Sequence, residues 1–224
     1  MKQVGVFALP TEGVLQRTGY PIAPERWAAL RRIPHEAARA QSIATELLLC
    51  WAVRQFKPQG VPVPPVRSLS PKGKPYFAQN PGFAFSLSHA GDWAVLAVCD
   101  APVGVDIEAV GQDRPQVVAR FFHPRERDAY FALPEDARTD AFYTLWVRKE
   151  AVVKALGDGM HRPFASFAVP LPPADAVYGL DQPAALFSLP FPGPYKLGGC
   201  VLSPGPVQAR LQVLSLDQAC SKST

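Results

Sequence analysis

Proline limits the length of every element that this chain can form. Its 224 residues include 25 prolines, gathered at 58–65, 163–173 and 189–206. Proline lacks a backbone N–H and clashes with the preceding helical turn, so it is excluded from helix interiors and central strands. The sequence therefore predicts short elements and stiff loops rather than a long bundle. Hydrophobic residues, at 48% of the chain, suffice for a folded core.

Charge and cysteine usage exclude several classes of protein. A formal net charge of +4 permits an acidic partner or a phosphate ligand but does not indicate nucleic-acid binding. The four cysteines are far apart and form no CxxC or Cys/His pattern. This spacing argues against a disulfide framework and against a zinc site, and it is typical of proteins in a reducing compartment. No segment has the roughly 18 apolar residues of a membrane span, and the N-terminus lacks the apolar run of a signal peptide. We expect a soluble cytoplasmic protein without a membrane or nucleic-acid partner.

Alternating apolar residues predict short strands. The first is expected at 4–9, and the segments 83–88 and 93–98 flank the turn-like HAGD (89–92), which predicts a hairpin. A third strand of this meander follows at 103–108. Further short strands are expected at 166–169, 185–189 and 211–216.

Helical spacing fills two regions, 24–56 and 124–156. Both regions start with the same order of features. A Glu-Arg pair, at Glu25 in the first region and at Glu126 in the second, is followed by a segment that begins with proline and then by an apolar helix. The two pairs lie about 100 residues apart, which suggests two similar α+β halves. The predicted halves are residues 1–101 and residues 102–224.

The strand VGVDIE (103–108) carries two acids on one face. Residues two apart in a strand point the same way, so Asp106 and Glu108 are expected side by side. Two neighbouring carboxylates raise each other's pKa unless a cation or a donor compensates them. One interpretation is an edge strand with a wet face, and the other is half of an oxygen-ligand site for Mg²⁺ or a similar hard cation.

The helix predicted at 140–156 carries lysines that could compensate these carboxylates. Glu150 and Lys154 are four residues apart in the favourable order, which as an isolated pair would be a surface salt bridge. Lys149, however, projects near the middle of the apolar stripe, where its ammonium needs an anionic partner. We therefore interpret this helix as one wall of an ionic pocket. If Asp106 and Glu108 line the other wall, the set suits Mg²⁺ bound to phosphate oxygens.

With these motifs, the chain resembles the 4′-phosphopantetheinyl transferases of the surfactin-synthetase-activating type. The matching elements, in the family's order over roughly residues 70–170, are GKP (73–75), SLSHAG (86–91), VGVDIE (103–108), Arg120-Phe-Phe122 through Glu126, and FYTLWVRKEAVVKA (142–155) followed by Gly157 and Gly159. The resemblance implies two α+β halves in a pseudo-twofold arrangement, with the active site between them. It implies transfer of the 4′-phosphopantetheine arm from coenzyme A to a serine hydroxyl of an acyl, peptidyl or aryl carrier protein, releasing 3′,5′-ADP. Such carriers serve fatty acid, polyketide and nonribosomal peptide synthesis, and the two halves suggest a monomer.

The resemblance also implies roles for individual residues. Asp106, Glu108 and Glu150 match the family's ligands for Mg²⁺, with Mn²⁺ as the other option. Lys74, Ser88 and His89 match contacts to coenzyme A, and Lys154 matches the lysine near its pyrophosphate. The family's arginine for the nucleotide phosphates aligns with Gln41, a departure, so Arg31, Arg32 or Arg39 is expected to supply that charge. Glu150 is the expected proton acceptor for the serine, with Glu126 as the alternative.

Two rival functions remain open at this stage. The same three acids suit another Mg²⁺-dependent phosphotransferase or phosphohydrolase, although the chain has no P-loop and no GxGxxG motif. The fold also suits a non-catalytic module that only binds carrier proteins. The complete set of acids and Lys154 favours an enzyme.

Overall fold

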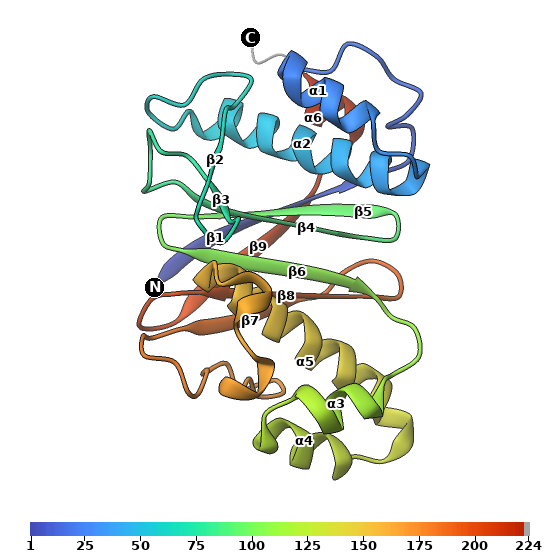
Figure 1. Cartoon of the computed structure of the whole chain (residues 1–224), viewed down its shortest axis with the longest axis vertical. Helices are drawn as coiled ribbons and strands as arrows, with labels where there is room; N and C mark the ends of the chain where they lie inside the picture. Colours follow the sequence, from blue (N-terminus) through green and yellow to red (C-terminus); the bar gives the residue numbers. More distant parts are fainter. Residues whose placement is uncertain (222–224) are drawn as a thin grey trace.

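The computed structural model describes residues 1–221 and shows a mixed α+β fold (Figure 1). The strands are β1 (Lys2–Pro10), β2 (Ser68–Leu69), β3 (Pro75–Tyr76), β4 (Ala84–Ala90), β5 (Trp93–Cys99), β6 (Val103–Ala109), β7 (Ala185–Leu189), β8 (Tyr195–Val201) and β9 (Val207–Val213). The α-helices are α1 (Pro24–Arg31), α2 (Glu36–Phe56), α3 (Pro115–Phe121), α4 (Pro124–Phe131), α5 (Glu135–Leu156) and α6 (Leu216–Cys220), and short 3-10 turns lie at η1 (Gly159–His161) and η2 (Phe164–Ser166). Within residues 1–221, no helix has the length and apolar character needed to cross a membrane.

Two sheets are built by the same sequence of connections. In the first, β1 leads through helices and the short antiparallel pair β2–β3, a separate two-stranded sheet, to the β4–β5 hairpin, and β5 pairs antiparallel with β1. In the second, β6 leads through helices to the β7–β8 hairpin, and β8 pairs antiparallel with β6. The tripeptide Val-Gly-Val occurs in both leading strands, at 4–6 near the start of β1 and at 103–105 at the start of β6. The order of the larger sheet is β4-β5-β1-β9, with β9 parallel to β1, and that of the smaller is β6-β8-β7.

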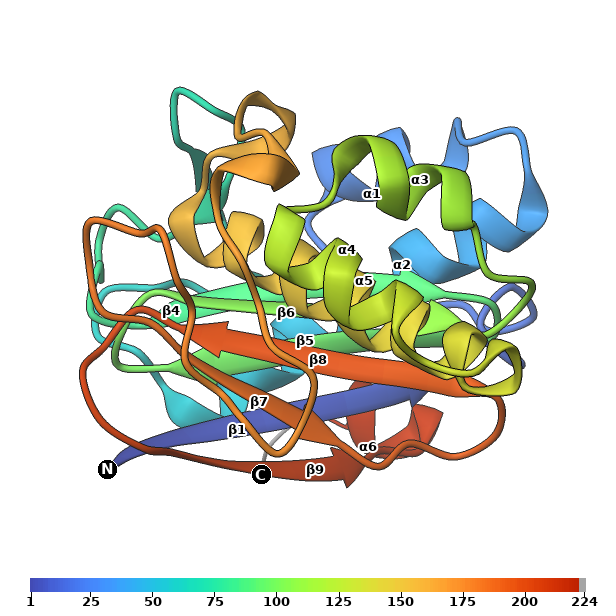
Figure 2. The same ribbon diagram turned by 90° about the horizontal axis from the view of Figure 1, so that it is seen from below.

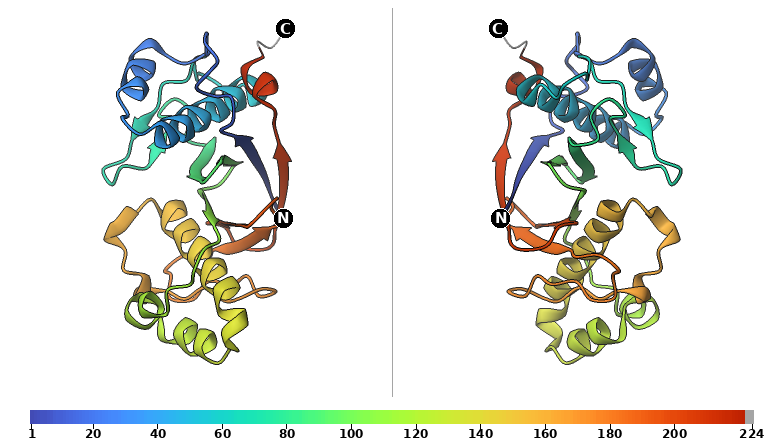
Figure 3. Two further views of the ribbon diagram at one scale, coloured as in Figure 1. Left: turned by 90° about the vertical axis from the view of Figure 1, so that its right-hand side faces the viewer. Right: turned by 90° about the vertical axis from the view of Figure 1, so that its left-hand side faces the viewer.

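The sheets stack between two long helices. Helix α2 covers the outer face of the larger sheet, and α5 runs across β6 and β8 on the outer face of the smaller one (Figures 2 and 3). Apolar side chains from the facing surfaces of both sheets fill the space between them. These include Val4, Val6, Ala8, Val95, Ala97, Val103, Val105, Ile107, Leu197 and Val201. Successive side chains of a strand point to opposite faces of its sheet. The residues between these apolar positions therefore face the covering helices.

Most of the expected elements are confirmed, with corrections at their ends. The predicted turn at 89–92 is shorter, because His89 and Ala90 belong to β4 and pair with Ala94 and Trp93 of β5. The predicted strand at 166–169 is wrong: this stretch holds the end of η2 and a single bridge at Ala168. The predicted strand at 211–216 is displaced, since β9 ends at Val213. Strand β8 was not predicted, because its sequence YKLGGCV follows prolines and holds two glycines, a composition typical of a loop.

The last strand and the last helix return to the first sheet. β9 pairs with β1, and α6 packs against α2, although both lie in the second of the two predicted halves. The division at residues 101 and 102 stays a prediction.

Candidate active site

A glycine lets α5 lie unusually close to β6. A Cβ built on Gly104 would lie 1.9 Å from the carbonyl oxygen of Ala151 and 2.5 Å from the backbone N of Ala155. No other residue fits there, because helix backbone cannot rotate aside as a side chain can. Gly198 on β8 approaches α5 in the same way, with a built Cβ 3.3 Å from the backbone N of Arg148. The close packing brings the polar residues of α5 against those of β6.

The two acids of β6 share the face that looks toward α5, as the sequence predicted. Val103, Val105 and Ile107 point into the core between the sheets. Asp106 and Glu108, at the alternate positions, therefore face the helix that carries Glu150 and Lys154. Strand β6 lies at an edge of its sheet, but the expected wet face is wrong for Asp106, which is only 4% exposed.

Asp106, Ser88 and Lys154 form a triangle of hydrogen bonds. The Lys154 ammonium donates to Asp106 Oδ1 at 2.6 Å and to Ser88 Oγ at 2.8 Å. The Ser88 hydroxyl donates to the same Asp106 Oδ1 at 2.7 Å. The other carboxylate oxygen, Asp106 Oδ2, is buried and has no hydrogen-bond partner within residues 1–221. A buried carboxylate oxygen without a donor is costly, which is why such an atom commonly serves a ligand.

Glu108 and Glu150 complete a group of three interacting carboxylates. Burial raises the pKa of Glu150, and the nearby charge of Asp106 raises it further, while Lys154 acts in the opposite direction. Burial and Asp106 also raise the pKa of Glu108. The indole Nε1–H of Trp146 donates to Glu108 Oε1 at 3.2 Å and fixes that carboxylate from α5.

Asp106, Glu108 and Glu150 provide only some of the ligands that a divalent cation needs. In the part of the chain that the structure describes, no three His, Cys, Asp or Glu side chains are arranged as a ready metal-binding group. Mg²⁺, however, usually takes one or two protein carboxylates and completes its shell with water and substrate phosphates. The unpartnered Asp106 Oδ2 provides such a carboxylate oxygen, and the charges of Glu108 and Glu150 lie near it. These residues therefore fit a cation that is bound together with a phosphate ligand.

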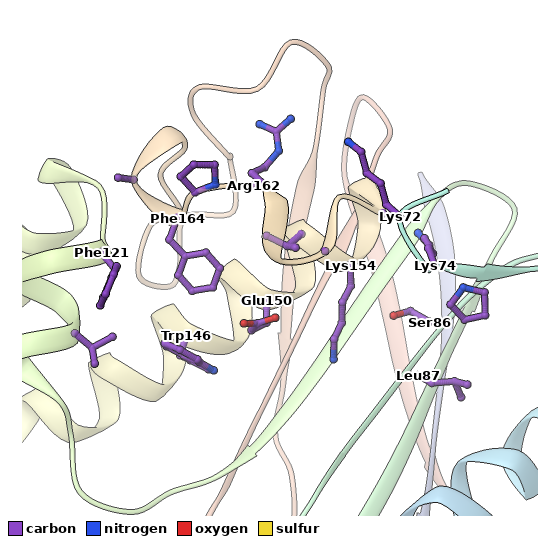
Figure 4. A pocket seen from close by; sticks show the side chains of 18 of the residues that line it. Lys72, Lys74, Ser86, Leu87, Phe121, Trp146, Glu150, Lys154, Arg162 and Phe164 are labelled. Atoms are coloured by element: carbon purple, nitrogen blue, oxygen red, sulfur yellow. The ribbon is translucent and has the colours of Figure 1, made fainter. Parts of the chain in front are cut away.

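A cavity of roughly 880 Å³ opens beside this group. Its walls come from both predicted halves: the loop 72–75 and β4 on one side, and α3, α5 and the segment 157–165 on the other (Figure 4). Positive side chains gather at one end, namely Lys72, Lys74, Lys154 and Arg162. Aromatic side chains line the other end, namely Phe121, Trp146 and Phe164. Arg120 also lines the cavity, and its guanidinium lies over the Phe121 ring. The cavity thus offers an anion-binding end and a largely aromatic end, with Glu150 between them.

Lys74 lies at the edge of this cavity and joins the two predicted halves. Its ammonium donates to the carbonyl oxygens of Ala155, at 2.8 Å, and Val103, at 3.2 Å. Burial lowers the pKa of this amine to about 8. The carbonyl of Ala155 is one of those that a helix C-terminus leaves without an intrahelical partner, so Lys74 stabilises the end of α5.

The interpretation of Lys149 as part of the ionic pocket is wrong. Its ammonium is fully buried on another face of α5, where it donates to both oxygens of Glu126, at 2.7 and 2.8 Å, and to the Phe167 carbonyl. It also lies 4.1 Å from the centre of the Phe167 ring. The anionic partner that the sequence required is therefore Glu126. That carboxylate also accepts from the backbone N–H groups of His123 and Val169, so its oxygens are fully engaged.

The remaining predicted residues lie outside the cavity lining. His89 lies on β4 next to Ser88, and its pKa is lowered by partial burial and by the charge of Lys154. Arg39 donates to the Ile33 carbonyl and to Glu36, and Arg31 is exposed at the end of α1. Gln41 donates to the Gly91 carbonyl at 2.8 Å, close to His89 in sequence. Roles for these side chains stay predictions.

Sequence reasoning missed an ionic cluster at the cationic end. Asp158 accepts from Lys72 at 2.7 Å and from Arg162 at 2.6 Å, and both cations lower its pKa. Lys72 and Asp158 come from loops far apart in the chain, and Arg162 directly precedes the proline-rich stretch 163–173, in which no site residue was predicted. The one available signal was the position of Lys72 directly before the GKP motif.

Comparisons with known proteins agree with this geometry. Residues 102–192 match the model of the 4′-phosphopantetheinyl transferase superfamily. A 4′-phosphopantetheinyl transferase of Bacillus subtilis is 32% identical over 153 residues, which cover 67% of this chain and 66% of that protein. The 4′-phosphopantetheinyl transferase psf-1 of Bacillus pumilus is 41% identical over 99 residues, covering 44% of this chain and 42% of that protein. The 4′-phosphopantetheinyl transferase gsp of Aneurinibacillus migulanus is 25% identical over 206 residues, which cover 89% of this chain and 84% of that protein. The chain thus spans slightly less than two thirds of the length of the first of these relatives.

Proposed function

The chain belongs to the 4′-phosphopantetheinyl transferase superfamily, and we propose that it transfers the 4′-phosphopantetheine arm of coenzyme A to a serine of a carrier protein. The names of its relatives support this activity. The observation that carries the proposal is the group formed by Asp106, Ser88 and Lys154 at a cavity with an anion-binding end. A diphosphate needs this combination of a cation site, a fixed ammonium and further positive charge.

In this proposal Asp106, Glu108 and Glu150 hold a divalent cation, Mg²⁺ or Mn²⁺. The bound cation neutralises negative charge on the diphosphate of coenzyme A. Lys154 reaches the same place from α5 and offsets the charge that develops on the departing 3′,5′-ADP. Lys74, Ser88 and His89 contact the coenzyme. Arg31 and Arg39 supply charge for the nucleotide's phosphates, since Gln41 carries none.

The transfer forms one bond and breaks one. The serine oxygen of the carrier forms a bond to the phosphorus that bears the pantetheine arm, and the bond from that phosphorus to the 3′,5′-ADP oxygen breaks. The serine proton passes to Glu150, directly or through a water molecule, because this carboxylate lines the cavity and burial raises its pKa toward that of a useful base. Glu126 is not available for this step, since Lys149 and two backbone N–H groups occupy its oxygens.

We also propose that the two α+β halves, 1–101 and 102–224, are related by a pseudo-twofold axis, with the active site between them. The repeated connection of strand, helices and hairpin supports this arrangement, as does the cavity with walls from both halves. One chain contains all of the proposed groups, so we propose a monomer whose partners are coenzyme A and an acyl, peptidyl or aryl carrier protein. The four scattered cysteines, without a CxxC or Cys/His pattern, support the proposal of a cytoplasmic location.

The direct test incubates the protein with coenzyme A, Mg²⁺ and a panel of apo carrier proteins. The expected result is a carrier whose mass increases by one phosphopantetheine arm, measured by intact-protein mass spectrometry. Glu150→Gln should abolish the mass gain, while Glu135→Gln, at the exposed start of the same helix, should leave it unchanged. Absence of the mass gain with every carrier, from a protein with native circular dichroism, would overturn the proposal.

A further inference from the structure

Lys154 already occupies the place where positive charge is needed among the three acids. Its ammonium lies 2.6 Å from Asp106 Oδ1, and the side chain is 30% exposed on the cavity side. The other two acids of the group, Glu108 and Glu150, lie close enough for Lys154 to lower the pKa of each. One ammonium thus compensates three carboxylates in the absence of any other cation.

We propose that Lys154 and the divalent cation compete for Asp106, so that the lysine holds the acids together until the cation replaces it. The inference rests on the proposed function, because it concerns the cation site named there. The cation is expected on Asp106 Oδ2, while Lys154 and Ser88 hold Oδ1 of the same carboxylate. An ammonium and a divalent ion on the two oxygens of one carboxylate lie close enough to repel each other. Binding of the cation is therefore strengthened when Lys154 leaves Asp106.

The flexible side chain of Lys154 allows its ammonium to move from Asp106 into the cavity. Lys154 lines the cavity, and four methylene groups let its ammonium turn from Asp106 toward a ligand there. The same movement that opens the acids would then deliver a positive charge to the diphosphate of coenzyme A. The cation and the coenzyme should consequently bind with positive cooperativity, since each favours the same position of Lys154.

The competition can be measured with Mn²⁺ alone, without coenzyme A or carrier. Electron paramagnetic resonance of free Mn²⁺ gives the dissociation constant for the full-length protein. We expect Lys154→Met to bind Mn²⁺ about tenfold more tightly than wild type, because the competing charge-assisted hydrogen bond is gone. Lys154→Arg, which retains a positive charge beside Asp106, should bind it as weakly as wild type.

Lys72→Met is the matched control. It removes the same charge from the same cavity, but Lys72 pairs with Asp158 rather than with the three acids. Its Mn²⁺ affinity should equal that of wild type. If Lys72→Met tightened Mn²⁺ binding as much as Lys154→Met, or if Lys154→Met left it unchanged, direct competition would be overturned.

A second measurement uses the wild-type chain, in case Lys154→Met does not fold. After reductive ¹³C-methylation, the Lys154 signal is identified by its loss in Lys154→Arg. Saturating Mg²⁺ should move this signal toward that of a solvated lysine, and an unmoved signal would overturn the inference. The carrier mass-gain assay on wild type separates the two proposals. If the carrier gains mass but Lys154 and the cation do not compete, only this inference is overturned. If no carrier gains mass, the proposed function is overturned.

Discussion

Gly104 lies directly against the carbonyl of Ala151, at a distance that leaves no room for a Cβ atom. This contact fixes the spacing of β6 and α5, the two elements that supply the three carboxylates and Lys154. The geometry of the candidate site therefore depends on a residue that has no side chain and touches no ligand.

Gly104→Ala should destabilise the protein strongly. The added methyl would meet backbone atoms of Ala151 and Ala155, so α5 must shift, at a cost of about 3 kcal/mol in the free energy of unfolding. Urea titration followed by circular dichroism measures the change. Gly82→Ala is the control, because its added Cβ would meet only the Asn80 side chain, at 3.6 Å, and its stability should stay near that of wild type. Equal stability of both variants would contradict the packing argument.

Glu150 should titrate above the ordinary glutamate value in the protein without a divalent cation. Burial and the neighbouring Asp106 raise its pKa above the usual 4.5, so its charged form is lost as the pH falls through that raised value. Mg²⁺ should lower this pKa, because a nearby positive charge favours the carboxylate. NMR of ¹³C-labelled glutamate, with the Glu150 signal identified by its loss in Glu150→Gln, follows the titration with and without Mg²⁺. A pKa at or below 4.5 in the metal-free protein would contradict the prediction.

Breaking the buried pair of Lys149 and Glu126 should cost more stability than removing the whole pair. Burial lowers the pKa of Lys149 to about 8 and raises that of Glu126, so both charges depend on each other. Lys149→Met leaves Glu126 buried without its cation and should cost about 3–5 kcal/mol. Adding Glu126→Gln should recover part of this loss. Additive effects of the two changes in thermal or urea unfolding would show that the pair is not coupled.

His89→Ala should weaken binding of coenzyme A without slowing the chemical step. His89 lies beside Ser88 and near Lys154, but no bond formed or broken in the transfer needs it. Loss of one hydrogen bond to a phosphate should raise the KM for coenzyme A about tenfold and leave kcat nearly unchanged. Steady-state kinetics at saturating carrier gives both constants, and an unaltered KM would remove His89 from the binding site.

The acids and Lys154 could be predicted from the sequence because their spacing follows local geometry. A two-residue period places Asp106 and Glu108 on one face of a strand, and a four-residue period places Glu150 beside Lys154 on a helix. Lys149 also belongs to that helix, but the direction of its side chain depends on where Glu126 lies after folding. The pairing of Lys72 with Asp158 joins distant loops and is set by the tertiary packing. Strand β8 was missed because Gly198 and Gly199, which weaken a strand locally, are required there by α5 and by Phe187.

The pairing of β9 with β1 restricts how the chain can fold as it is synthesised. β1 begins at Lys2, and its parallel partner begins at Val207, so the larger sheet stays incomplete while nearly everything between them is translated. Until then one edge of β1 exposes unpaired backbone groups, which invite pairing with other chains. The emerging polypeptide should therefore depend on chaperones that shield this edge, and truncations before residue 207 should aggregate rather than yield a separately folded first half.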